Sequence, residues 1–134
     1  MQIPQGATVV VADGEKISLF KNTGTANAVK LEATPIETPD SENSGSGARH
    51  QNSAANPSES QASEDDFAAG VATMLNAKVQ QDSIQALVVI AAPRTLGELR
   101  KHYSKQLSSV LVGEVSKDLT GHTSSDIEKV ILAA

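Results

Sequence analysis

The stretch ALVVIAAPRTLGELRKHYSKQL, residues 86–107, decides the fold of this chain. It begins with seven apolar or small residues, Ala86–Ala92, a run too short to span a membrane. The valine and isoleucine content of this run is typical of a strand buried on both faces, as in a parallel sheet. Pro93 ends the run.

The residues after this strand predict a helix. Thr95 and Glu98 have the T-x-x-E spacing of a capping box, in which each side chain accepts a hydrogen bond from a free backbone N–H of the first turn. We therefore expect the helix to begin at about Leu96. Its apolar stripe is then made by Leu96, Leu99, Tyr103 and Leu107.

Three cations lie close to this predicted helix start: Arg94, Arg100 and Lys101. Open α/β sheets bind ligands where the carboxyl end of a strand meets the amino end of a helix, which also attracts anions. The sequence therefore predicts a ligand site that includes these cations and Thr95. The alternative is that the cations only form the solvated face of an amphipathic helix.

The first 36 residues predict three antiparallel strands: Thr8–Ala12, Lys16–Lys21 and Val29–Ile36. The first two are joined by Asp13-Gly14, a strong hairpin signal, since such turns need positive φ. Asp13 at the end of a strand could be a metal ligand, but an aspartate at this position more commonly stabilises the turn.

A long polar segment follows. From residue 38 to residue 66 alanine is the only apolar residue apart from proline and glycine, so the segment cannot bury enough surface to offset its ordering entropy. We expect a disordered loop at about 38–63. Ser63 is then the predicted N-cap of a helix. Its apolar stripe would comprise Phe67, Val71, Met74, Leu75 and Val79.

The last quarter of the chain predicts another strand, Val110–Val115, and a final helix. The turn between them contains Lys117 and His122, which also follow a strand and precede a helix. His122 could contact an anion at the helix amino end, but a residue at this position more commonly only stabilises the turn. We add both residues to the candidate ligand-binding residues. Ser125 and Glu128 repeat the capping-box spacing at the start of the final helix.

These elements occur in the order β-β-β-loop-α-β-α-β-α. Short hairpins and right-handed crossovers place the last two strands beside the first, which gives a mixed five-stranded sheet of order 3-2-1-4-5. The predicted fold class is α/β, a ribonuclease H-like three-layer arrangement with three helices and the long loop. Such a fold does not by itself confer an activity.

Length and composition fit one soluble domain that spans residues 1–134. The chain has no cysteine, which excludes disulfides and thiolate chemistry, and no apolar run approaches 18 residues. We expect a cytoplasmic protein without membrane insertion. Residues 1–85 carry 5 Lys and Arg against 11 Asp and Glu, and residues 86–134 carry 6 against 5. Because neither half is strongly basic, we expect no DNA binding.

No catalytic motif is recognisable. A two-metal nuclease needs several converging carboxylates, and the strand that ends at Ala92 offers none. P-loop, nucleophile-elbow and zincin spacings are absent. A metal-dependent hydrolase would have to use Asp13, Glu114 and Asp118. We predict no catalytic residues, no metal and no cofactor.

Three segments carry a family resemblance: VVVADGEKISLF at 9–20, VVIAAPRTLGELRK at 88–101 and GEVSKDLTGH at 113–122. They resemble the bacterial host attachment proteins, which are required for attachment to host cells. That family is similar to the middle domain of archaeo-eukaryotic peptide-chain release factors and Pelota. There, a strand-DG-strand hairpin and a third strand lead into a long loop.

In the release factors this loop carries the Gly-Gly-Gln motif that enters the peptidyl transferase centre. The loop here, residues 39–63, has no Gly-Gly-Gln, and its closest approach is GSGARHQ at 45–51. The resemblance therefore implies no peptidyl-tRNA hydrolysis.

Two functions follow from the resemblance. The first is a non-enzymatic interaction protein that supports host attachment indirectly through an unknown protein partner. The second is a factor that associates with the ribosome or with RNA such as tRNA and lacks the hydrolysis motif. In both, the candidate ligand-binding residues are Arg94, Thr95, Arg100, Lys101, Lys117 and His122.

Overall fold

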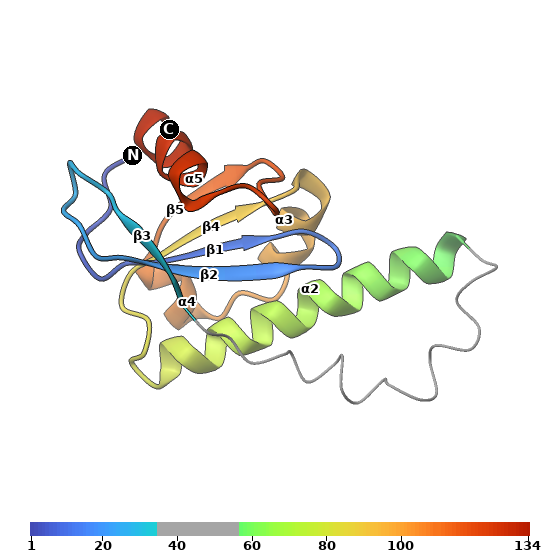
Figure 1. Ribbon diagram of the computed structural model, residues 1–134. Coiled ribbons are helices and arrows are strands. Elements are labelled where there is room, and N and C mark those ends of the chain that lie inside the picture. Colours follow the sequence, from blue (N-terminus) through green and yellow to red (C-terminus); the bar gives the residue numbers. More distant parts are fainter. Residues whose placement is uncertain (35–56) are drawn as a thin grey trace.

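A computed structural model describes residues 1–34 and 57–134, with side chains from residue 63 onward in the second stretch. The five strands form one sheet of order β3-β2-β1-β4-β5, as the sequence predicted (Figure 1). The strands are β1 (Thr8–Ala12), β2 (Ile17–Asn22), β3 (Leu31–Thr34), β4 (Leu87–Ala91) and β5 (Leu111–Ser116). The helices are α2 (Pro57–Gln80), α3 (Pro93–Arg100), α4 (Lys105–Val110) and α5 (Ser124–Ala133).

The sheet is antiparallel on one side of β1 and parallel on the other. β1 pairs antiparallel with β2 and parallel with β4, and β4 pairs parallel with β5. The register places Ala12 beside Ala91, so these two strands end at the same edge of the sheet. β5 contains an extra residue, Val112, because Leu111 and Gly113 pair with consecutive residues of β4. Such a bulge is common on edge strands.

Each face of the sheet has its own apolar core. Figure 1 shows α2, α3 and α4 on one face and α5 on the other. Alternate residues of β4 point to opposite faces: Val89 packs in the core beneath α2, and Val88 packs in the core beneath α5. This two-sided burial explains why β4 has the uninterrupted apolar sequence of a strand without a solvated face.

The first described helix begins earlier than predicted. Ser63 is not an N-cap, because α2 starts at Pro57 and Ser63 lies in its second turn. Proline is well tolerated at the first helical position, and the Glu, Gln and Ala residues that follow have high helix propensity. The predicted disordered loop therefore overlaps a helix from residue 57 onward. Its remaining part, residues 38–56, lies outside the described residues.

The predicted helix at 96–107 is two helices. α3 begins at Pro93, its N-cap is Ala92, and no side chain caps it, so the Thr95–Glu98 capping box was wrong. The preceding strand ends at Ala91, which leaves Pro93 in the position where its fixed φ favours a helix start. α4 begins after Ser104, whose hydroxyl accepts a hydrogen bond from the Leu107 N–H.

The final helix also uses a different cap from the one predicted. Thr123 is the N-cap of α5, and its hydroxyl oxygen accepts a hydrogen bond from the Asp126 N–H at 3.2 Å. Ser125 therefore lies within the helix. Glu128 does not return to the first turn, because its carboxylate accepts a hydrogen bond from the Leu31 N–H of β3 at 2.7 Å. This contact ties α5 to the far edge strand.

Candidate functional site

The parallel strands end at one edge of the sheet, which we call the carboxyl edge and define as residues 13–16, 92–95 and 117–122. Beyond this edge, β1 turns toward β2, whereas β4 leads through α3 and α4 to β5 on the other side. The chain thus leaves these two neighbouring strands in opposite directions. In open α/β sheets ligands bind outside the carboxyl ends of neighbouring parallel strands.

Asp13 closes the turn between β1 and β2. Its Oδ1 atom accepts hydrogen bonds from the backbone N–H groups of Glu15 and Lys16, at 2.7 and 2.6 Å. The interpretation of Asp13 as a turn residue is therefore confirmed. Burial raises the pKa of Asp13, but these two hydrogen bonds and a third from Thr120 outweigh it and hold the pKa below its ordinary value.

Thr120 connects this turn to the loop between β5 and α5. Its hydroxyl lies 2.8 Å from Oδ2 of Asp13 and 2.7 Å from Oδ1 of Asp118. Asp118 also accepts a hydrogen bond from the Thr120 N–H, so the loop is held by its own side chains. The sequence analysis did not single out Thr120. Two signals were available: Thr120 follows a strand, and it lies within the segment GEVSKDLTGH at 113–122 that carries the family resemblance.

The start of α3 lies between these two polar segments. Ala92 donates its N–H to Ala12 and accepts a hydrogen bond from the Leu96 N–H, so the N-cap is fixed against β1. Arg94 is exposed on the first turn, whereas Thr95 is buried and only 7% exposed. Among the described residues, no group accepts a hydrogen bond from the N–H of either residue. Both predicted residues therefore lie at the carboxyl edge.

Arg100 and Lys101 do not lie there. Because α3 begins at Pro93 and rises about 1.5 Å per residue, they lie at its carboxyl-terminal end, away from the predicted junction. Although Lys101 still lies within electrostatic range of the Arg94 guanidinium, which acts to lower the lysine's pKa, the expectation that all three cations gather at the helix start was wrong. The physical reason is the helix start itself, which is three residues earlier than the predicted capping box implied.

Arg100 forms a cluster with Glu114 of β5 and Tyr103. Its Nη2 atom lies 2.8 Å from Oε1 of Glu114, and the Tyr103 hydroxyl donates to Oε2 at 2.9 Å. Burial raises the pKa of Glu114, but these two donors outweigh it and lower the pKa. Burial and the hydrogen bond to Glu114 raise the pKa of Tyr103. The arrangement ties α3 and the turn after it to the edge strand.

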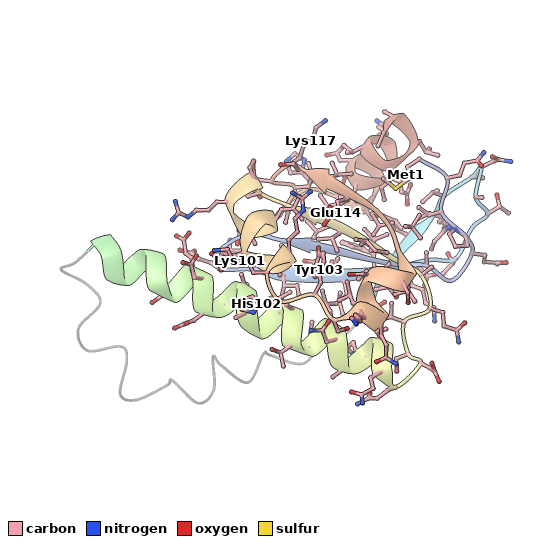
Figure 2. The ribbon with its side chains drawn as sticks, turned by 180° about the vertical axis from the view of Figure 1, so that it is seen from behind. Met1, Lys101, His102, Tyr103, Glu114 and Lys117 are labelled. Carbon is pink, nitrogen blue, oxygen red and sulfur yellow. The ribbon has the colours of Figure 1, made fainter. Side chains whose placement is uncertain are left out.

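Lys101 is engaged by a different acid. Its Nζ atom lies 2.7 Å from Oε1 of Glu98, and this contact raises the lysine's pKa. Figure 2 shows Lys101 and His102 on the side of α2, and Asn76 of α2 donates a hydrogen bond to the His102 carbonyl at 2.8 Å. Lys117 lies on the opposite side of the sheet in the same view.

Lys117 and His122 flank the loop at the carboxyl edge, and both are exposed. Nδ1 of His122 lies 3.7 Å from a carboxylate oxygen of Asp126, one helical turn along α5. The six predicted binding residues thus separate into two groups. Arg94, Thr95, Lys117 and His122 belong to the carboxyl edge, and Arg100 and Lys101 belong to the far end of α3.

The geometry gives no support to a metal-dependent hydrolase. Glu114 is held by Arg100 and Tyr103 on β5, whereas Asp13 and Asp118 meet at Thr120, so the three acids do not converge. Across residues 1–34 and 57–134, no three His, Asp or Glu side chains are arranged to hold a metal ion.

A search for helices able to cross a membrane found none in the same part of the chain.

Comparison with known proteins identifies one family. The model of bacterial archaeo-eukaryotic release factor family 12 matches residues 6–131, which is nearly the whole chain. No curated protein matches the sequence. The predicted similarity to archaeo-eukaryotic release factors is therefore confirmed at the level of the family.

Proposed function

Because the chain belongs to bacterial archaeo-eukaryotic release factor family 12, we propose that it associates with the ribosome or with tRNA. The family match over residues 6–131 is the observation that carries this proposal. The strand-DG-strand hairpin and the third strand on which the resemblance to release-factor middle domains rests are present in the fold as β1, β2 and β3.

In this proposal the protein binds without hydrolysing peptidyl-tRNA. The sequence contains no Gly-Gly-Gln, and GSGARHQ at 45–51, which is its closest approach, lies outside the described residues. The carboxylates of Asp13 and Asp118 at the carboxyl edge are already hydrogen-bonded to the turn and to Thr120. A peptide-release assay on programmed ribosomes should therefore give the rate measured without the protein.

The surface charge suggests the kind of contact. The formal net charge is −5, so attraction to an RNA backbone has to come from local cations rather than from the whole molecule. Arg94 and Lys117 are exposed cations at the carboxyl edge, and neither forms an ion pair with another described residue. We take this pair as the RNA-facing contact.

Sedimentation with ribosomes tests the proposal. The protein should pellet with ribosomes at low salt. Because binding depends on a few contacts between cations and phosphates, which added salt screens, the protein should be released as the salt concentration rises. The double variant Arg94→Gln, Lys117→Gln should pellet less. Lys129→Gln, which removes an exposed cation from α5, is the matched control and should behave like the parent. Failure of the parent protein to pellet at any salt concentration would contradict ribosome association.

Host attachment is the second candidate, favoured by the segments at 9–20, 88–101 and 113–122. In this case the protein would act indirectly, as a non-enzymatic module that binds a protein partner inside the cell. A deletion strain complemented with the Arg94→Gln, Lys117→Gln variant separates the two candidates. Restored attachment together with lost ribosome pelleting would favour the protein-partner function over the ribosomal one.

A further inference from the structure

Thr95 has an unusual environment for a polar side chain. Two polar residues are buried in the described part of the chain, Asn22 and Thr95. The Asn22 amide makes five hydrogen bonds: its nitrogen donates to three carbonyls, and its oxygen accepts from two backbone N–H groups. The Thr95 hydroxyl makes none with any described residue, although the side chain is only 7% exposed.

Buried polar groups in native proteins nearly always have a partner, and one that lacks a partner calls for an explanation. Burial of an unsatisfied hydroxyl destabilises the folded state, so valine would pack at this position more favourably. A hydroxyl that binds a ligand absent from the free protein accounts for the observation.

The position of Thr95 indicates which ligand. It is the third residue of α3, an eight-residue helix whose first turn has no side-chain cap. Cα–Cβ bonds in a helix tilt toward its amino end, so the Thr95 side chain leans back over the first turn. The free N–H groups of Arg94 and Thr95 point the same way. These three donors lie together at the first turn of α3, which also carries the exposed side chain of Arg94.

All of these groups are donors, and the helix amino end adds positive partial charge, so the ligand must present several acceptor oxygens and negative charge. Glu98 lies one helical turn after Arg94 and Thr95 on α3, and its carboxylate pairs with Lys101. Asp13 follows the β1 residue that is bonded to Ala92. Its carboxylate already accepts hydrogen bonds from Glu15, Lys16 and Thr120, which compensate part of its charge. It does not compete for the donors of α3.

We propose that the first turn of α3 is a binding site for a phosphate group, held by the N–H groups of Arg94 and Thr95, the Thr95 hydroxyl and the Arg94 side chain. The phosphate could belong to a free nucleotide or to an RNA strand, which offer the same chemistry. The site does not depend on ribosome association, because a small phosphate ligand fills it equally.

The first experiment follows backbone amide signals while the protein is titrated with sodium phosphate. A parallel titration with sodium chloride at matched ionic strength removes the general effect of salt. Phosphate should shift the amide signals of Arg94 and Thr95 with one saturating curve, and chloride should not. Absence of a saturable shift at these two amides would overturn the proposal.

The second experiment compares three variants. Thr95→Val keeps the shape of the side chain, removes the hydroxyl and should weaken phosphate binding about tenfold, since a hydrogen bond to a charged group has that effect. Thr95→Ser retains the hydroxyl and should bind within about twofold of the parent. Thr73→Val, an exposed position on α2, is the matched control. Equal affinity for Thr95→Val and the parent protein would overturn the role of Thr95.

Adenosine monophosphate and a short unstructured RNA then identify the source of the phosphate. If the mononucleotide binds as tightly as the RNA, the site takes a single terminal phosphate. If the RNA binds more tightly and Thr95→Val weakens it, the site takes a backbone phosphate. Both results support a phosphate site, and neither requires that the protein pellets with ribosomes. Binding of both ligands without any loss in Thr95→Val would contradict it.

Discussion

The two strand-to-helix junctions at the carboxyl edge differ in how their polar groups are used. Between β5 and α5, Thr120 contacts two carboxylates, and Thr123 caps the helix. Between β4 and α3 no side chain caps the helix, and the hydroxyl of Thr95 has no described partner. The threonine hydroxyls of the first junction have partners within the fold, whereas the hydroxyl of Thr95 at the second junction has none among the described residues.

This difference separates structural roles from binding roles. A polar residue whose hydrogen bonds close within the fold stabilises the loop that contains it, so its replacement destabilises the protein. A buried polar residue without a partner destabilises the free protein. Its replacement by an apolar residue of the same shape should therefore stabilise the protein. The two junctions can therefore be told apart by stability measurements alone, before any ligand is known.

The two glycines of these junctions should give the largest contrast. Gly121 has φ of +83°, whereas Gly97 lies inside α3 with open space where a Cβ would be. Gly121→Ala should lower the free energy of unfolding by about 1–2 kcal/mol, because an L side chain is strained at positive φ. Gly97→Ala should raise it by about 0.5–1 kcal/mol through helix propensity. Urea unfolding measures both, and effects of equal sign would contradict the assigned backbone geometry.

The cap of α5 gives the next largest effect. Thr123→Ala should lower the free energy of unfolding by about 1 kcal/mol, because the Asp126 N–H loses its acceptor. Ser125→Ala is the control and should change stability by less than about 0.5 kcal/mol, since Ser125 is exposed inside the helix. The capping box predicted from the sequence requires the reverse result, so the pair tests the structure directly.

Thr95→Val tests the second junction without a ligand. The free energy of unfolding should rise by as much as about 1 kcal/mol, because a buried hydroxyl without a partner is replaced by a methyl group. Thr73→Val on α2 removes a hydroxyl that bonds to the Ala69 carbonyl on an exposed surface, and it should be nearly neutral. Destabilisation by Thr95→Val would show that the hydroxyl already has a partner in the free protein.

The smallest effect concerns acid stability at the first junction. The pKa of Asp13 is lowered in the folded protein, so its contribution to stability is present above the unfolded pKa of about 4 and is lost as pH falls through the folded value. Thr120→Val removes one stabilising hydrogen bond and should raise the Asp13 pKa toward its ordinary value.

A carboxyl NMR titration of Asp13 measures this change, and the acid dependence of the melting temperature should become shallower. Glu114 is the internal control, because Arg100 and Tyr103 lower its pKa through contacts that Thr120→Val leaves intact. A Glu114 pKa that moves together with that of Asp13 would indicate a general change in the fold.

Part of the candidate site was predictable from the sequence. Arg94 and Thr95 follow a strong buried-strand signal, so their place at the carboxyl edge required only the strand and its parallel neighbour. Arg100 and Lys101 were misplaced because T-x-x-E suggested a helix start three residues too late. Local spacing cannot distinguish a capping box from a threonine in the first turn of a helix that begins at proline.

The sequence alone determined the strand pattern, the sheet order and the two apolar cores. These depend on runs such as Leu87–Ala91 and on short connections, which are local properties of the chain. Only the tertiary structure decided which polar groups have a hydrogen-bond partner. Thr120 meets Asp13 across 107 residues, and Glu128 meets Leu31 across 97, distances over which no sequence pattern acts. The unused hydroxyl of Thr95 becomes evident only when every neighbouring group is in place, because a missing partner is a property of the whole packed fold.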